Sequence, residues 1–216
     1  MFFWGRFFLS LKLIFLAMVL TSCGAWLGPG DENNLATAAQ ASCGFLQNSY
    51  GQRVSWKQTS PVLFYIDPAF SLTEEAALIS AAHKWEQVVG RPLAVFQRVP
   101  SDKFWSPAVD RRNTIYYLYD WPFSYSNQQA VTQLYWAKNQ LIEADIKVNR
   151  KYFRYFIEKP DSTSVHFESL MIHELGHALG LTHYFEAPTV MWSILALGVV
   201  RNKLSQKDES NLACEY

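Results

Sequence analysis

The sequence predicts an α+β domain in which a mixed β-sheet packs against helices. Short β-branched and aromatic runs bounded by turn residues indicate strands. Two segments, residues 72–89 and 170–179, instead place apolar residues on one face at helical spacing. A strand, a helix, several strands and a further helix, in that order, suggest helices lying on a sheet. The length of 216 residues suits one domain with appendages.

Each element follows from local residues. A helix is predicted to begin after Ser71, because Ser71 and Glu74 have the spacing of a capping box, and to end at Gly90. We expect His83 in this helix to be a surface or packing residue. Residues 151–159 are aromatic and basic, and are predicted to form a loop or surface extension. The predicted strands are residues 61–67, 93–99, 113–118, 130–136 and 144–149.

Three of the five histidines stand in one stretch, residues 173–183, with the sequence HELGHALGLTH. On a helix, His173 and His177 share one face and can bind the same ion. Gly180 can take a left-handed conformation that ends the helix and returns His183 to that ion. Glu174 lies about 100° round the helix and can reach a water at the metal. Three nitrogen ligands, an open position and a base are the layout of a metal-assisted hydrolase.

This stretch resembles the long metzincin motif, and Met191, eight residues beyond His183, stands at the distance of the Met-turn in the matrixin branch. The resemblance extends to residues 61–67, 81–85, 144–149 and 204–208. It implies a zincin-like metzincin fold, with a twisted, mixed, mainly parallel five-stranded sheet, an active-site helix and a C-terminal helix.

The resemblance also implies a role for each matching residue. His173, His177 and His183 would bind one catalytic zinc ion, and Glu174 would be the general base of a metalloendopeptidase. Met191 would form a hydrophobic floor beneath the three imidazoles.

Further matches concern the substrate and the Met-turn. Asp208 would brace the Met-turn, and residues 192–199 would form a wall of the pocket for the residue after the cleaved bond. The strand at residues 130–136 would pair with an extended protein or peptide substrate.

The sequence also departs from the family in ways that limit the comparison. Tyr184 stands where animal matrixins have Ser or Thr, and Ser193 stands where other branches have a tyrosine ligand. No histidine lies between His83 and His166, so a second, structural zinc is not expected. Calcium remains open but is not assigned to residues. We expect His166 to be a surface residue at the start of the site helix, with a supporting role behind the metal as the alternative.

Residues 1–22 have the pattern of a secretory signal: Arg6 and Lys12 precede an apolar run at 13–20 that is shorter than the roughly 20 residues of a membrane span. The sequence LTSCG at 20–24 resembles the lipobox of bacterial lipoproteins, in which Cys23 is lipidated. That implies a lipid anchor in the bacterial cell envelope, and Gly24 favours the outer membrane. An ordinary cleaved signal is the alternative.

Residues 23–53 are interpreted as a lipidated tether and N-terminal segment, and residues 54–216 as the catalytic domain. With Cys23 lipidated, Cys43 and Cys214 remain and are predicted to form a disulfide in an oxidising compartment. A propeptide cysteine that ligates zinc is the alternative for Cys43, but the flanking Arg and Asp of such a switch are absent.

Two functional hypotheses follow. The first is a membrane-tethered zinc endopeptidase, which the intact Glu174 favours. The second is a lipoprotein that uses the same fold for binding or envelope structure, with weak catalysis; hydrolysis of a non-protein amide, such as a peptidoglycan cross-link, is a third possibility. The formal net charge of zero gives no reason to expect a nucleic-acid partner.

Overall fold

The computed structural model describes residues 18–19, 42–57, 60–100, 107–185 and 188–216. Most of the predicted signal peptide, the lipidation site Cys23 and the tether up to residue 41 lie outside the described residues.

Five strands form the main sheet: β2 (Val62–Ile66), β3 (Ala94–Arg98), β4 (Asn113–Leu118), β5 (Ala130–Ala137) and β6 (Gln140–Asn149). Their order is β5-β6-β4-β2-β3, and only the β5–β6 pair is antiparallel. The predicted mainly parallel, five-stranded mixed sheet is therefore confirmed. A two-residue strand, β1 (Met18–Val19), pairs antiparallel with the outer edge of β5.

The strand sequences explain which face of the sheet is covered. In β2, alternate residues are buried, as the period of two requires for a sheet with one covered face. In β6, the residues are buried on both faces, and the strand begins at Gln140, four residues before the predicted start. A tight connection at Lys138, whose φ is 57°, joins β5 to β6 and extends both strands beyond the apolar run that the sequence displays.

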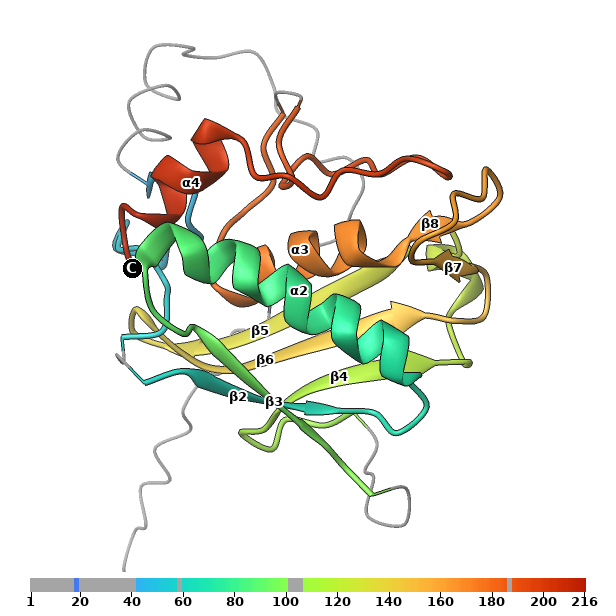
Figure 1. Cartoon of the computed structure of the whole chain (residues 1–216). Coiled ribbons are helices and arrows are strands. Elements are labelled where there is room, and N and C mark those ends of the chain that lie inside the picture. The colour runs from blue at the N-terminus through green and yellow to red at the C-terminus, as the bar shows by residue number, and fades with distance from the viewer. Residues whose placement is uncertain (1–17, 20–41, 58–59, 101–106, 186–187) are drawn as a thin grey trace, which may run out of the picture.

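Helices α2 (Leu72–Val89) and α3 (Phe167–Ala178) lie over the same face of the sheet (Figure 1). The predicted capping box is present, since the Ser71 side chain accepts from Glu74 N and the Glu74 carboxylate accepts from Ser71 N. Gly90, with φ 69°, ends α2 in the left-handed conformation. The Trp85 indole donates to Ile172 O at 2.9 Å and joins the two helices.

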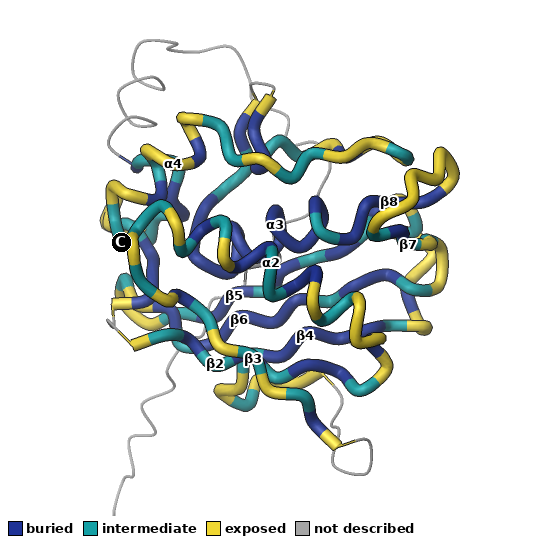
Figure 2. The backbone as a smooth tube through the Cα atoms, viewed as in Figure 1, coloured by how far each residue is buried: buried dark blue, intermediate teal, exposed yellow. Residues whose placement is uncertain are grey.

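All residues of α3 except Glu168 are buried, and Figure 2 shows this helix as one of the most enclosed parts of the chain. Two short strands, β7 (Tyr155–Phe156) and β8 (Val165–His166), pair in parallel just before α3. The segment 151–159, predicted to be a loop or surface extension, therefore contains the two-residue strand β7. The remaining elements are the 3₁₀ helix η2 (Phe123–Tyr125) and the helix α4 (Gln206–Leu212). Within the described residues, none of the helices is long and apolar enough to cross a membrane.

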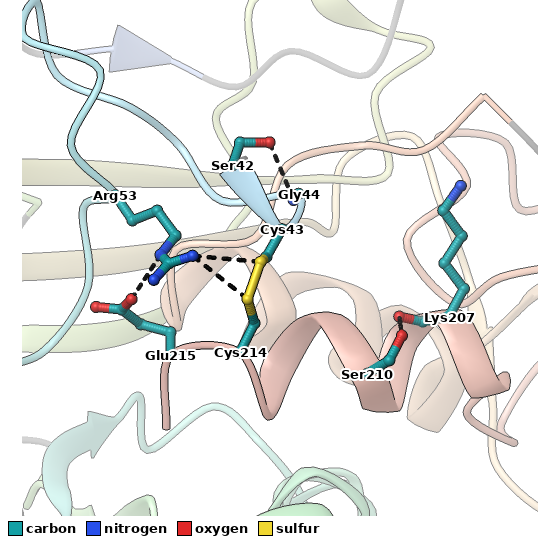
Figure 3. Close-up of a disulfide and its surroundings, with 8 residues drawn as sticks. All are labelled: Ser42, Cys43, Gly44, Arg53, Lys207, Ser210, Cys214 and Glu215. Carbon is teal, nitrogen blue, oxygen red and sulfur yellow. Dashed lines mark hydrogen bonds and ion pairs between the residues drawn. A yellow bond between two sulfur atoms is a disulfide. The ribbon is translucent and has the colours of Figure 1, made fainter. Parts of the chain in front are cut away.

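The N-terminal segment 42–53 belongs to the packed domain. Phe45 and Leu46 are buried in the core, so the folded part begins no later than residue 42, and the predicted boundary at residue 54 was too late. A disulfide joins Cys43 to Cys214, 171 positions apart in sequence (Figure 3). Beside it, Arg53 Nε donates to the Glu215 carboxylate at 2.7 Å, so an ion pair and a disulfide connect the same two ends of the chain.

Candidate active site

The end of α3 turns the chain back toward the helix. Leu181 N donates to Gly176 O at 3.0 Å and Gly180 N donates to His177 O at 2.8 Å, which is a Schellman motif. Gly180 has φ 104°, and a Cβ there would lie 2.3 Å from Val54 O. Only glycine fits this position, because both the backbone conformation and the approach of Val54 exclude a side chain.

This turn brings the three predicted histidines together. The Nε2 atom of His177 lies 3.0 Å from the Nε2 atoms of both His173 and His183, and the third side of the triangle is 3.1 Å. These are the residues that form the one candidate metal-binding group among the described His, Cys, Asp and Glu side chains. Tetrahedral zinc with Zn–N bonds of 2.0–2.1 Å requires N···N distances of about 3.3 Å. The three nitrogens therefore fit a zinc ion after an opening of a few tenths of an ångström.

In two of the three histidines, the ring nitrogen that faces away from the other histidines, Nδ1, is hydrogen-bonded to a backbone carbonyl. His173 Nδ1 lies 2.8 Å from Val190 O, and His177 Nδ1 lies 2.7 Å from Leu181 O. A carbonyl can only accept, so each Nδ1 carries the proton and each Nε2 presents a lone pair. Lone pairs that converge at 3 Å repel one another unless a cation or a proton lies between them. This donor set therefore matches a zinc site in its chemistry as well as in its spacing.

Burial keeps these imidazoles neutral. It is the main cause that lowers the pKa of His173 to about 3 and that of His183 to about 4, with a smaller contribution from neighbouring positive charges. The pKa of His177 is also lowered well below its ordinary value, again chiefly by burial. Neutral imidazole is the form that binds a metal, so proton competition is weak at neutral pH.

Glu174 is buried beside the histidines and held by one side chain. Thr132 Oγ1, on the inward face of β5, donates to Glu174 Oε2 at 2.6 Å. Burial raises the pKa of Glu174 to about 7, and the hydrogen bond from Thr132 opposes that rise. A carboxylate with a pKa near neutrality suits proton transfer in both directions, and a divalent cation nearby would lower the pKa.

The Met-turn lies directly against α3. Met191 is fully buried, and a Cβ at Gly176 would lie 2.3 Å from its Sδ atom. Asp208 Oδ2 accepts from Val190 N at 3.1 Å, which confirms the expected brace between α4 and the Met-turn. Because Val190 O in turn accepts from His173, the terminal helix is linked to the metal-binding group through one residue.

Of the other two histidines, one lies where the sequence suggested and one does not. His83 is exposed on α2, as expected. His166 is not a surface residue: it is 4% exposed, because its Nε2 lies 3.0 Å from Ile157 O and its Nδ1 contacts Ser169. Tyr184 is buried against Gly44, where a Cβ would lie 2.1 Å from its hydroxyl oxygen. Tyr184, which replaces the Ser or Thr of animal matrixins, therefore packs against the N-terminal segment at Gly44.

A cavity of about 150 Å³ adjoins the metal-binding group, and its lining includes His173, Glu174, Leu195 and Arg201. The sequence analysis did not identify two residues of this region, Thr132 and Arg201. The one available signal for Thr132 was a polar residue at an inward position of an otherwise apolar strand. Arg201 gave no signal, because it lies in an irregular segment.

Comparison with known proteins agrees with this geometry. The family model described as Matrixin matches residues 125–216, which contain β5, β6, α3, the Met-turn and α4. No curated protein matches the sequence. The match supports a matrixin-like metallopeptidase, and it implies zinc at the three histidines.

Proposed function

We propose that the protein is a zinc-dependent endopeptidase in which His173, His177 and His183 hold the metal and Glu174 is the general base. The observation that carries the proposal is the meeting of three Nε2 lone pairs within 3.1 Å of one another, beside a buried carboxylate at the same cavity. A metal site with a purely structural role has no use for such a carboxylate.

A bound zinc ion supplies a Lewis acid that polarises the scissile carbonyl and lowers the pKa of water. The protein's own residues supply the proton transfer. Glu174 accepts a proton from the attacking water and returns it to the leaving amine nitrogen. Thr132 holds one carboxylate oxygen and so sets the orientation of the other. Burial of α3 fixes the histidines, because a packed helix places side chains more accurately than a loop.

The edge of the sheet at β5 is suited to binding a peptide substrate. In the five-stranded sheet β5 is the edge strand, and the backbone of Met18–Val19 pairs with it antiparallel at Leu134 and Gln133. An extended peptide can add to the same edge through main-chain hydrogen bonds. Gln129 and Ala130, at the start of β5, also line the cavity beside Glu174, so a peptide along this edge would pass the metal-binding group. Such a peptide need not end there, which favours an endopeptidase.

The proposal includes a location. Cys23 would carry the lipid anchor of a bacterial envelope lipoprotein, with the outer membrane as its destination, and residues 24–41 would be the tether. The sequence of the apolar run and the lipobox supports this. The Cys43–Cys214 disulfide is of the kind that persists in an oxidising compartment. Globomycin, an inhibitor of the lipoprotein signal peptidase, should cause the unprocessed precursor to accumulate; unchanged processing would contradict lipidation.

The activity is tested with a peptide library, incubated with the purified protein before and after zinc removal by a chelator. We expect cleavages that disappear with the chelator, return with zinc, and are absent in a Glu174→Gln variant that still binds zinc. Chelator-sensitive cleavage of no peptide would refute the endopeptidase and favour a binding or structural lipoprotein. Release of fragments from peptidoglycan alone would point to a non-protein amide.

A further inference from the structure

The cavity beside the metal-binding group contains a cation that the proposed mechanism does not use. Arg201 lines this cavity together with His173, Glu174 and the segment 192–195. A guanidinium remains protonated at any physiological pH, so the cavity contains a permanent positive charge.

The hydrogen bonds of Arg201 leave part of the guanidinium unpaired. Nη1 donates to Ile194 O at 2.8 Å and Nη2 donates to Trp192 O at 2.7 Å, with Val190 O farther away at 3.5 Å. Nε is buried and has no partner. A guanidinium has five N–H groups, so these bonds cannot satisfy all of them.

The charge of Arg201 also lacks an ion-pair partner among the described residues. Asp208 attracts it without forming an ion pair: Asp208 Oδ2 accepts from Val190 N and from Ser205 N and Oγ, and Asp208 Oδ1 is buried without a hydrogen-bond partner. The Arg201 guanidinium also lies over the Trp192 ring, 5.7 Å from its centroid, and its hydrogen bonds go to neutral carbonyls. Without an anionic hydrogen-bond partner it retains a desolvation cost that an incoming carboxylate would offset.

Glu174 is the carboxylate that lines the same cavity, and its oxygen Oε2 is held by Thr132. A divalent cation at the three histidines would outweigh the charge of Glu174. The potential in the cavity then favours an anion. The volume of about 150 Å³ is about five times the roughly 30 Å³ that one water occupies in the liquid, so a side chain of four or five heavy atoms fits.

We propose that Arg201 makes this cavity a carboxylate-binding subsite, so that the enzyme selects substrates with an acidic group just after the cleaved bond. The carboxylate is either the side chain of Asp or Glu at that position or the free C-terminus of a short leaving fragment. The inference rests on the proposed function for its place in catalysis. The predicted selectivity is chemical: a planar carboxylate can accept two N–H groups from a guanidinium, whereas an amide of the same shape offers one oxygen.

Binding tests the subsite without relying on hydrolysis. The zinc-loaded full chain is titrated by calorimetry with Glu-Leu-amide, Gln-Leu-amide and Gln-Leu with a free C-terminal carboxylate, which represent leaving fragments. We expect the first to bind about tenfold or more tightly than the second. If the third matches the first, the subsite accepts both acidic side chains and chain ends; if it matches the second, the subsite accepts acidic side chains only. If the third alone binds tightly, the subsite accepts chain ends only. Equal affinity for all three peptides would overturn the proposal.

Variants separate recognition by charge from support of the cavity wall. In Arg201→Gln the ratio of Glu-Leu-amide to Gln-Leu-amide affinity should fall to about one, and Arg201→Lys should retain a preference for the acid. Lys203→Gln, which removes an exposed cation two residues away, is the matched control and should leave the ratio unchanged. If Arg201→Gln weakens both ligands equally, Arg201 only braces the segment 190–194 and the proposal fails.

The test extends to turnover through kcat/KM. The ratio of kcat/KM for Glu to that for Gln is measured with peptides that differ only at the residue after the cleaved bond. If no peptide is cleaved but Arg201-dependent binding persists, the endopeptidase proposal fails and the carboxylate subsite stands. If peptides are cleaved with no preference for acidic residues and the three dipeptides bind with equal affinity, the endopeptidase stands and the subsite fails. Where a variant does not fold, the wild-type affinities alone decide, since equal affinity for all three peptides refutes the subsite.

Discussion

Removing the Cys43–Cys214 disulfide should destabilise the domain and loosen the metal-binding group. The perturbation is the double substitution Cys43→Ser with Cys214→Ser. The crosslink spans 171 positions, and the loss of loop-closure entropy for a loop of that length corresponds to about 5 kcal/mol in the chain-entropy model. Measured effects commonly fall below this ideal, so we expect a loss of about 3–5 kcal/mol in the free energy of unfolding. That is a large share of the roughly 5–15 kcal/mol that stabilises a typical domain.

The local effect follows from what the disulfide holds in place. Leu46 N donates to Gly180 O at 2.8 Å, and Thr182 N donates to Gly44 O at 2.7 Å. Residues 44–46 therefore form a support for the segment that carries His183. When Cys43 is released, this support is held only by its packing, its hydrogen bonds and the nearby Arg53–Glu215 ion pair. We expect zinc affinity to fall about tenfold, as it does when groups that orient a ligand are lost.

The assay is urea unfolding followed by tryptophan fluorescence, with zinc affinity measured by competition against a chromophoric chelator. The slope of unfolding free energy against urea should rise in the variant, because its unfolded chain exposes more surface without the crosslink. Wild type in a reducing agent is the control and should behave as the variant does. A loss below about 1 kcal/mol would refute the entropic argument, and an unchanged zinc affinity would refute the link to His183.

Four further substitutions test the site and the sheet. Glu174→Gln should retain zinc while kcat falls by about 10²–10⁴-fold, whereas His177→Ala should lose both zinc and activity; metal analysis with peptide assays distinguishes them. Gly176→Ala should cost about 1–3 kcal/mol in urea unfolding, because the new Cβ would lie 2.3 Å from Met191 Sδ, and a neutral effect would contradict this close packing. Burial raises the pKa of Asp145 from 3.8 to about 7, so the folded state holds an extra proton between those values and its stability falls as pH rises from about 4 to 7. Asp145→Asn should remove up to about 4 kcal/mol of that pH dependence; an equal difference from wild type at pH 4.5 and 7.5 would contradict the assignment.

Local sequence was informative where neighbouring residues determine the geometry. The capping box at Ser71 and the stop at Gly90 define α2 from a few adjacent residues. The spacing of His173 and His177 places both rings on one face for any helix, and Gly180 allows the return toward the helix. These features depend on the helical period and on allowed backbone angles, so the metal-binding group was predictable without tertiary structure.

Several predictions failed or were missing where distant segments meet. The boundary at residue 54 was too late, because Phe45 and Leu46 are too few to form a periodic pattern and their burial depends on contact with Gly180 and Leu181. His166 was expected at the surface, yet the return of the chain at Ile157 covers it.

The sequence by itself determined the class of chemistry: three imidazoles, a carboxylate and a methionine at spacings that a helix and a turn convert into a zinc site. Tertiary structure decided how that site is held and what it can select. Thr132 lies 42 positions from Glu174, and Arg201 lies 28 positions from His173 along the chain. The packing of a helix on a sheet edge and the path of an irregular segment bring them to the cavity, and neither is encoded in any local pattern. The proposed selectivity for an acidic group in the substrate therefore depends on a residue that only the folded chain brings to the cavity.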